Sequence, residues 1–244
     1  MPPTLYVIRH GQGEHNVNDQ SHLKDPLLTD TGKAQCKSLQ EHFPFLQDVQ
    51  AIVVSPLRRT IQTAAFVFAP ELEKRQLPII LAPDAQEISH LACDLGYDAD
   101  VIKSHAPNLI AKAVPSYNAI NLDATLVDES WNLKKGINAP TLSAVRSRAS
   151  RLRNWIYNRP EKHIALVTHG GFLHYLTEDW NGYEKANGTG YRNCEYRKLV
   201  FTECSNGENS HLQEYGSMLG KQERPVRLYS SGFDEIEQAE NASA

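Results

Sequence analysis

The apolar residues of the chain gather in short runs that stop abruptly at polar or charged positions. Runs of this kind, rich in β-branched residues and too short for helices, are typical of buried strands. They predict strands at 4–8, 51–54, 79–81 and 162–168. A fifth segment, Cys194–Thr202, alternates apolar and polar residues, which favours an antiparallel strand at the edge of the sheet.

Segments with helical spacing of apolar residues separate these strands. Helices are expected at 32–42, 59–68, 99–105 and 142–158, and a further helix is expected to begin at 169–171. Alternation of strands and helices is typical of βαβ units, whose strands run parallel. The prediction is an α/β fold: a three-layer α/β/α sandwich with a mainly parallel central sheet and one antiparallel edge strand.

Two stretches depart from this pattern. Residues 88–140 are irregular apart from one helix, so we expect an inserted lid or a small subdomain there. Beyond about Ser205 the periodicity fails, and the acidic end, Asp234–Ala244, is expected to be mobile. The predicted organisation is a main domain at 1–205 followed by a C-terminal extension at 206–244.

The composition narrows the class of protein. With 244 residues, 41% of them hydrophobic, the chain can bury a full core. A net charge of −4 gives no electrostatic sign of a nucleic-acid partner. The sequence shows neither a bilayer-spanning apolar stretch nor a signal-peptide pattern, and its four cysteines form no disulfide framework. We expect a cytoplasmic protein without a membrane partner, and both a monomer and a homodimer remain open.

The candidate chemistry lies where predicted strands end. Two strands end in a histidine followed by glycine, at Arg9-His10-Gly11 and at Thr168-His169-Gly170. A third strand leads to Arg58 and Arg59, and a fourth leads to Glu87. Parallel strands present their carboxyl ends at one edge of the sheet, where α/β proteins bind ligands. Guanidinium groups bind phosphate oxygens, a neutral imidazole attacks phosphorus and a carboxylic acid protonates a leaving oxygen. These groups together favour phosphoryl transfer.

Other residues add less to this picture. Backbone N–H groups at Gly170 and Gly171, where a helix begins, are expected to act as further anion donors. The remaining histidines lack the spacing of a zinc site, so neither a metal nor another cofactor is expected. His15 is among those expected near the mouth of the site, and Cys93 is expected to be buried rather than reactive.

Four motifs, in order along the chain, carry a family resemblance. Arg9-His10-Gly11 with Asn16 is similar to R-H-G-x(4)-N, and residues 55–64 are similar to S-P-L-x-R-[AT]-x-x-T-A. Residues 25–32 resemble D-x-x-L-T-x-x-G, and residues 167–171 resemble a closing H-G motif. These are motifs of the histidine phosphatase superfamily, the phosphoglycerate mutase-like group, in its branch 1. The resemblance covers most of the chain.

The resemblance implies a role for each residue that matches a motif. His10 is the implied nucleophile, which becomes phosphohistidine. Arg9 and Arg59 are implied to bind the phosphoryl oxygens, and His169 to donate a hydrogen bond to the same group. Asn16 is implied as a polar contact in the phosphate pocket. Arg58 occupies the variable position of its motif and receives no such role.

Glu87 matches the residue that protonates the leaving alkoxide and afterwards activates water. The implied activity is hydrolysis of a small-molecule phosphate monoester through phospho-His10. A mutase is the alternative; residues 88–96 disfavour it, since they lack the run rich in Arg, Tyr and Asn-Lys that mutases carry after the acid. An inactive phosphoester-binding protein is a second alternative, disfavoured because every implied site residue is present.

Overall fold

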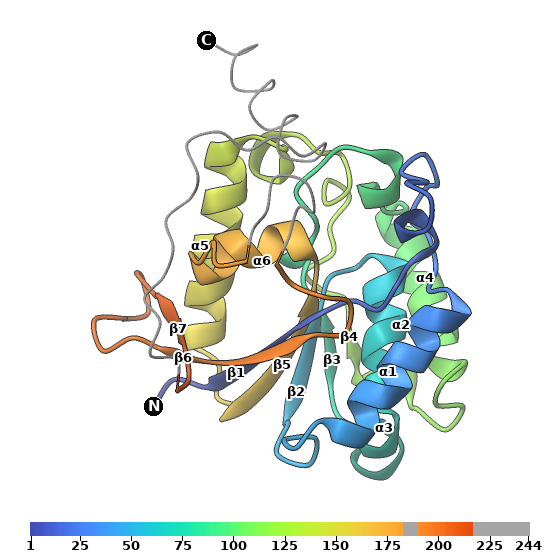
Figure 1. Ribbon diagram of the computed structural model, residues 1–244, viewed down its shortest axis with the longest axis horizontal. Coiled ribbons are helices and arrows are strands. Elements are labelled where there is room, and N and C mark those ends of the chain that lie inside the picture. Colours follow the sequence, from blue (N-terminus) through green and yellow to red (C-terminus); the bar gives the residue numbers. More distant parts are fainter. Residues whose placement is uncertain (183–189, 217–244) are drawn as a thin grey trace.

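The structure of the protein is a computed structural model that describes residues 1–182 and 190–216. Within these residues a seven-stranded sheet has the order β4-β3-β2-β5-β1-β6-β7 (Figure 1). The strands are β1 (Thr4–Arg9), β2 (Ala51–Val54), β3 (Ile79–Leu81), β4 (Leu122–Asp123), β5 (His163–Thr168), β6 (Tyr196–Phe201) and β7 (Leu212–Glu214). Strands β1 to β5 pair in parallel, while β6 is antiparallel to β1 and to β7. The mainly parallel sheet is confirmed.

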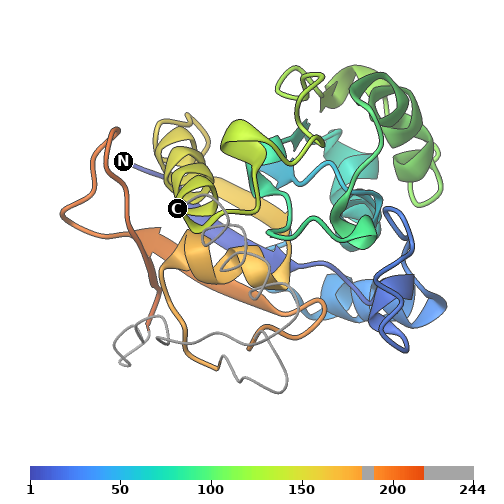
Figure 2. The same cartoon turned by 90° about the horizontal axis from the view of Figure 1, so that it is seen from above.

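Helices cover both faces of the sheet (Figures 1 and 2). They are α1 (Asp30–His42), α2 (Arg58–Val67), α3 (Ala69–Arg75), α4 (Ala99–Ala111), α5 (Leu142–Tyr157) and α6 (Gly170–Thr177). One core cluster joins Ile8 of β1 and Val167 of β5 to α1, α2, α3 and α4. The other joins Leu5 and Leu166 of the same strands to α5 and α6. Alternate residues of each strand therefore face opposite helical layers, as the predicted three-layer sandwich requires.

The two central strands are apolar on both faces. Leu5, Val7, Leu166 and Val167 are fully buried, because helices lie above and below the sheet at this point. Such strands have no solvent-facing side, and their polar residues come only at the ends. This is the reason that the continuous apolar runs of the sequence stop so abruptly.

The carboxy-terminal edge of the sheet differs from the prediction. Strand β6 is antiparallel, as expected, but β7 pairs with its outer side and places Leu212 opposite Phe201. Leu212 is fully buried in the cluster that also contains α5 and α6. The predicted boundary at residue 205 therefore falls inside the folded part of the chain. The predicted mobile end, Asp234–Ala244, lies outside the described residues.

The irregular segment 88–140 is part of the main core. Its helix α4 continues past Pro107 to Ala111, because Ile102, Leu109 and Ile110 are buried in the cluster shared with α2. The prediction ended this helix before the proline, and tertiary packing overrides that local preference. The segment also supplies the short strand β4. A small subdomain with its own core is therefore the wrong description of these residues.

Candidate active site

The carboxyl ends of β1 and β5 place two imidazoles side by side. Arg9 lies opposite Thr168 in the parallel register, so His10 and His169 both leave the sheet at the next position. Their ring centroids are 5.2 Å apart, and both side chains are buried. The structure therefore brings together the two histidines that the strand ends suggested.

The tautomer of His10 is fixed by its neighbour along the chain. The imidazole Nδ1 lies 2.7 Å from the carbonyl oxygen of Gly11, which only accepts, so Nδ1 carries the proton. The Nε2 atom is then unprotonated, and its lone pair accepts a hydrogen bond of 3.3 Å from Nε of Arg59. Burial, together with Arg59 and Arg9, lowers the pKa of His10 well below its usual value. His10 is thus a neutral imidazole with an available nucleophilic nitrogen.

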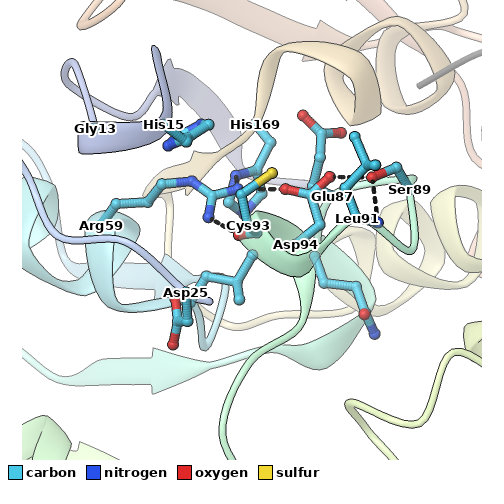
Figure 3. A network of polar contacts seen from close by, with 12 residues as sticks. Gly13, His15, Asp25, Arg59, Glu87, Ser89, Leu91, Cys93, Asp94 and His169 are labelled. Carbon is cyan, nitrogen blue, oxygen red and sulfur yellow. Dashed lines mark hydrogen bonds and ion pairs between the residues drawn. The ribbon is translucent and has the colours of Figure 1, made fainter. Parts of the chain in front are cut away.

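Arg59 lies at the centre of the polar network (Figure 3). The residue belongs to the first turn of α2 and is 1% exposed. Its Nη2 donates to Oδ1 of Asp94 at 2.8 Å, and its Nη1 donates to the Cys93 carbonyl at 2.6 Å. A cation near a helix N-terminus opposes the helix dipole. Asp94 offsets that cost and holds the guanidinium beside His10.

His169 has partners at both ring nitrogens. Its Nδ1 lies 3.0 Å from Nη2 of Arg59, which only donates, so Nδ1 accepts. The proton is therefore on Nε2, which donates to Oγ of Ser55 at 2.8 Å. Burial and the charge of Arg59 lower the pKa of His169 well below its usual value. His169 thus enters the site as a neutral imidazole held between β2 and α2.

The Glu87 carboxyl group sits at the N-terminus of α6. It accepts hydrogen bonds from the backbone N–H groups of Gly171 at 3.2 Å and Phe172 at 2.9 Å, and from its neighbour Ile88 at 3.0 Å. Burial raises the pKa of Glu87, and the nearby Asp94 raises it further, although these N–H donors act in the opposite direction. A carboxyl group with a raised pKa retains a proton that it can give away.

The position of Glu87 bears on the prediction that the first N–H groups of α6 bind an anion of the substrate. The N–H of Gly171, expected to bind an anion of the substrate, is bonded to Glu87 instead. A Cβ atom at residue 171 would lie 2.8 Å from Oε1 of Glu87, so a glycine is required for the carboxyl group to approach. Gly170 remains a candidate phosphate ligand only as a prediction.

Arg9 provides a second guanidinium close to the site. It follows the buried part of β1, and its charge interacts with both Glu87 and Arg59. One of its Nη atoms donates to the Tyr191 carbonyl. Its Nε is buried and has no hydrogen-bond partner within the described part of the chain. A buried donor without an acceptor suits a group that is completed by an anion.

Asn16 is exposed, and both ends of its amide are engaged. Its Oδ1 accepts from the Gly13 N–H at 3.0 Å, so its Nδ2 is the atom 3.1 Å from Nε2 of His15. The His15 ring lies 5.6 Å from that of His10, between centroids. Burial and Arg59 lower the pKa of His15 to about 3. In this structure Asn16 orients His15, and its predicted contact with a phosphoryl group remains a prediction.

Sequence reasoning did not single out Asp94, which holds Arg59 in place. Asp94 ends a short 3-10 helix, Ala92–Asp94, and its Oδ2 also accepts from the Ser89 hydroxyl at 2.6 Å. No periodic pattern marks it, since its neighbours are irregular. Cys93 beside it is buried, and burial raises the pKa of its thiol to about 12, as expected of an unreactive cysteine.

The fold and these groups define a class of protein: an α/β protein whose strand ends carry imidazole, guanidinium and carboxyl groups of the kind that suit phosphoryl transfer. The chain belongs to the histidine phosphatase superfamily, branch 1, whose family model matches residues 5–211. The resemblance seen in the four motifs is thereby confirmed. The match also extends past residue 205 and ends directly before β7.

Individual relatives are named both as mutase-like proteins and as phosphatases. Phosphoglycerate mutase-like protein 1 of Arabidopsis thaliana is 29% identical, covering 89% of this chain and 88% of the relative. A probable phosphatase of Schizosaccharomyces pombe is 30% identical, covering 68% of this chain and 74% of the relative. Among solved structures, Bacillus stearothermophilus YhfR aligns with a TM-score of 0.53 at 19% identity, covering 89% of this chain and 98% of that one. The last similarity shows the fold alone.

Proposed function

We propose that the protein hydrolyses a small-molecule phosphate monoester through a covalent phosphohistidine on His10. The observation that carries this proposal is the hydrogen bond from Nδ1 of His10 to the Gly11 carbonyl. It leaves Nε2 unprotonated, and Arg59 is the only donor that the described residues place at that nitrogen. Family membership supports phosphatase or phosphoryl-transfer activity in general.

In the first step the lone pair of His10 Nε2 attacks phosphorus. A P–N bond forms, the P–O bond to the alcohol breaks, and the proton of Glu87 passes to the leaving oxygen. Arg9 and Arg59 face the negative charge of the phosphoryl oxygens. His169 donates its N–H to Ser55 in this structure, so its hydrogen bond to the phosphoryl group requires that N–H to exchange partners. Because Nδ1 of His10 donates to a carbonyl, the positive charge that develops on the imidazole is stabilised where it forms.

In the second step the Glu87 carboxylate takes a proton from water, whose oxygen attacks phosphorus. The P–N bond breaks, phosphate leaves, and both His10 and Glu87 return to their initial protonation states. A mutase would instead return the phosphoryl group to the organic molecule. The departure of residues 88–96 from the mutase run supports hydrolysis.

The test measures phosphate release from p-nitrophenyl phosphate and from glycerol 3-phosphate. Wild type is expected to hydrolyse both, and His10→Ala to lose at least about 10³-fold in rate. His105→Ala is the matched control, because His105 is exposed on α4. Equal rates for wild type and His10→Ala would contradict the proposal. Conversion of labelled 3-phosphoglycerate to 2-phosphoglycerate without phosphate release would identify a mutase.

The surroundings of the enzyme enter the proposal only as expectations. Within residues 1–182 and 190–216, no helix has both the length and the apolar character required to cross a membrane. A cytoplasmic location, a small-molecule substrate, and the absence of nucleic-acid and membrane partners belong to the proposal. The oligomeric state is open between monomer and homodimer.

A further inference from the structure

Lys134, in the irregular segment 88–140, is a buried cation beside the proposed catalytic acid. Its side chain is 9% exposed, and its Nζ donates to the backbone carbonyl of Glu87 at 2.9 Å. Among the described residues no carboxylate oxygen lies within 4.0 Å of this nitrogen. A buried ammonium without a carboxylate partner is unfavourable for folding.

The backbone of Lys134 is unfavourable as well. Its φ is 51°, in the left-handed region that residues other than glycine rarely adopt. The adjacent residue, Lys135, is exposed and has an extended backbone. The buried charge and the strained φ of Lys134 are both unfavourable for the free energy of folding. Such a combination at one residue is typical of functional positions.

Two cations, Lys134 and Arg148, lie at the backbone carbonyl oxygen of Glu87. Nη2 of Arg148, on α5, lies 3.5 Å from this oxygen, and Nη1 of Arg148 donates to the Gln86 carbonyl at 2.8 Å. The Glu87 carbonyl thus keeps a donor if Lys134 is removed. The backbone at Glu87 does not by itself require a second cation.

We propose that Lys134 is a positioning residue whose charge stabilises the Glu87 carboxylate after Glu87 has given its proton to the leaving group. This inference rests on the proposed function of Glu87. In the first step Glu87, which is half-buried, becomes an anion with the negative charge of Asp94 nearby. Arg59 is already neutralised by Asp94 at 2.8 Å, whereas Lys134 has no carboxylate partner within residues 1–182 and 190–216. Lys134 therefore supplies positive charge at the moment when the acid becomes negative.

The charges around the two residues agree with this role. Those that interact with Glu87 are Asp94, Arg59, Arg9, Arg148 and Lys134. Those that interact with Lys134 are Asp94, Glu87, Arg148, Arg59 and His169. Burial lowers the pKa of Lys134 from 10.5 to about 7, and the carboxylates of Asp94 and Glu87 act in the opposite direction. A negative Glu87 thus favours the charged form of Lys134, as the proposal requires.

The test compares Lys134→Met, Lys134→Arg and the neighbouring control Lys135→Met. Single-turnover formation of phospho-His10 is followed against pH with glycerol 3-phosphate and with p-nitrophenyl phosphate. For Lys134→Met we expect formation from the alkyl ester to slow about three- to tenfold, and formation from the aryl ester, which hardly needs an acid, to change little. Loss of the positive charge raises the pKa of Glu87. The fall in rate on the high-pH side of the rate–pH profile is therefore expected to move to a pH that is higher by roughly 0.5–1 unit. For Lys134→Arg and Lys135→Met, the high-pH side of the rate–pH profile is expected to stay at the wild-type position.

A stability measurement separates this role from a structural one. Because the charge of Lys134 is buried and has no carboxylate partner in the described part of the chain, Lys134→Met is expected to keep or raise the melting temperature below pH 7. Equal slowing of both esters without a shift of the high-pH side of the rate–pH profile, or a clear loss of stability in Lys134→Met, would overturn the inference. A wild type that forms no phosphohistidine would refute the proposed function instead, so the two failures are distinguishable.

Discussion

Two groups of residues surround the proposed position of the phosphoryl group, and they come from different kinds of structure. The strand-end group consists of His10, Arg59 and His169. The segment group consists of Ser89, Asp94 and Lys134. The first group follows short buried strands whose positions are set by the sheet, and its members contact one another. The second group comes from the irregular segment, and two of its members contact other site residues: Asp94 contacts Arg59, and Lys134 contacts Glu87.

The contacts of the segment group show what the difference means. Asp94 holds the guanidinium of Arg59, Ser89 holds Asp94, and Lys134 holds the carbonyl of Glu87. Under the proposed function the strand ends supply the reacting and phosphate-binding atoms, while the segment sets their position and charge. Substitutions in the strand-end group are expected to remove activity, and those in the segment group to reduce it and to displace its pH dependence.

After His10→Ala, the largest effect is expected from Arg59, whose side chain differs in direction from that of its neighbour Arg58. Arg59 points into the site, whereas Arg58 donates to the Asp25 carbonyl and lies over the Tyr97 ring. Arg59→Met is expected to lower kcat/KM by about 10²–10³-fold, the usual effect of removing one preorganised donor. Arg58→Met, the matched control, is expected to stay within about threefold of wild type. Steady-state kinetics on one ester checks both, and equal losses would contradict the assignment.

An intermediate effect is expected from Glu87, which links the two groups. Glu87→Gln keeps the shape of the side chain and removes the proton that can be donated. Formation of phospho-His10 from an alkyl phosphate is expected to slow about 10²-fold, and formation from p-nitrophenyl phosphate much less. Rapid-quench measurement of both esters checks this prediction. Equal losses on the two substrates would remove Glu87 from the role of acid.

A smaller effect than those of Arg59 and Glu87 is expected from Asp94, a member of the segment group. Asp94→Asn keeps an oxygen for Arg59 but removes the negative charge, so we expect about a tenfold loss of kcat/KM. The charge of Asp94 raises the pKa of Glu87. Its removal therefore lowers that pKa, and activity on an alkyl phosphate is lost at a lower pH as pH rises. The shift in this pH is opposite in sign to the one expected for Lys134→Met. Shifts of the same sign in the two variants would contradict the roles assigned to Asp94 and Lys134.

The sequence predicted the strand-end group better than the segment group, and the reason is physical. Continuous apolar runs define β1 and β5, so the residues just after them are placed by the register of the sheet. Asp94 and Lys134 follow no period, and only the folded segment brings them to Arg59 and Glu87. Sequence reasoning therefore had no local signal for either residue.

The same distinction holds for the fold. Long periodic elements such as α5, and strands with a clear apolar run, were predicted close to their observed bounds. Strands β4 and β7 are two and three residues long, and unlike the equally short β3 they contain polar residues and no continuous apolar run. The end of α4 was misplaced because Pro107 is a local signal, while the burial of Ile110 is a tertiary one.

The central claim is that phosphorus becomes bonded to His10. The most direct measurement is rapid quenching of the enzyme with labelled p-nitrophenyl phosphate, followed by mapping of the labelled residue. The account predicts an acid-labile, alkali-stable phosphoprotein with the label on His10, absent from His10→Ala and present in His105→Ala. Undiminished labelling of His10→Ala, or turnover by wild type without any labelled protein, would contradict it.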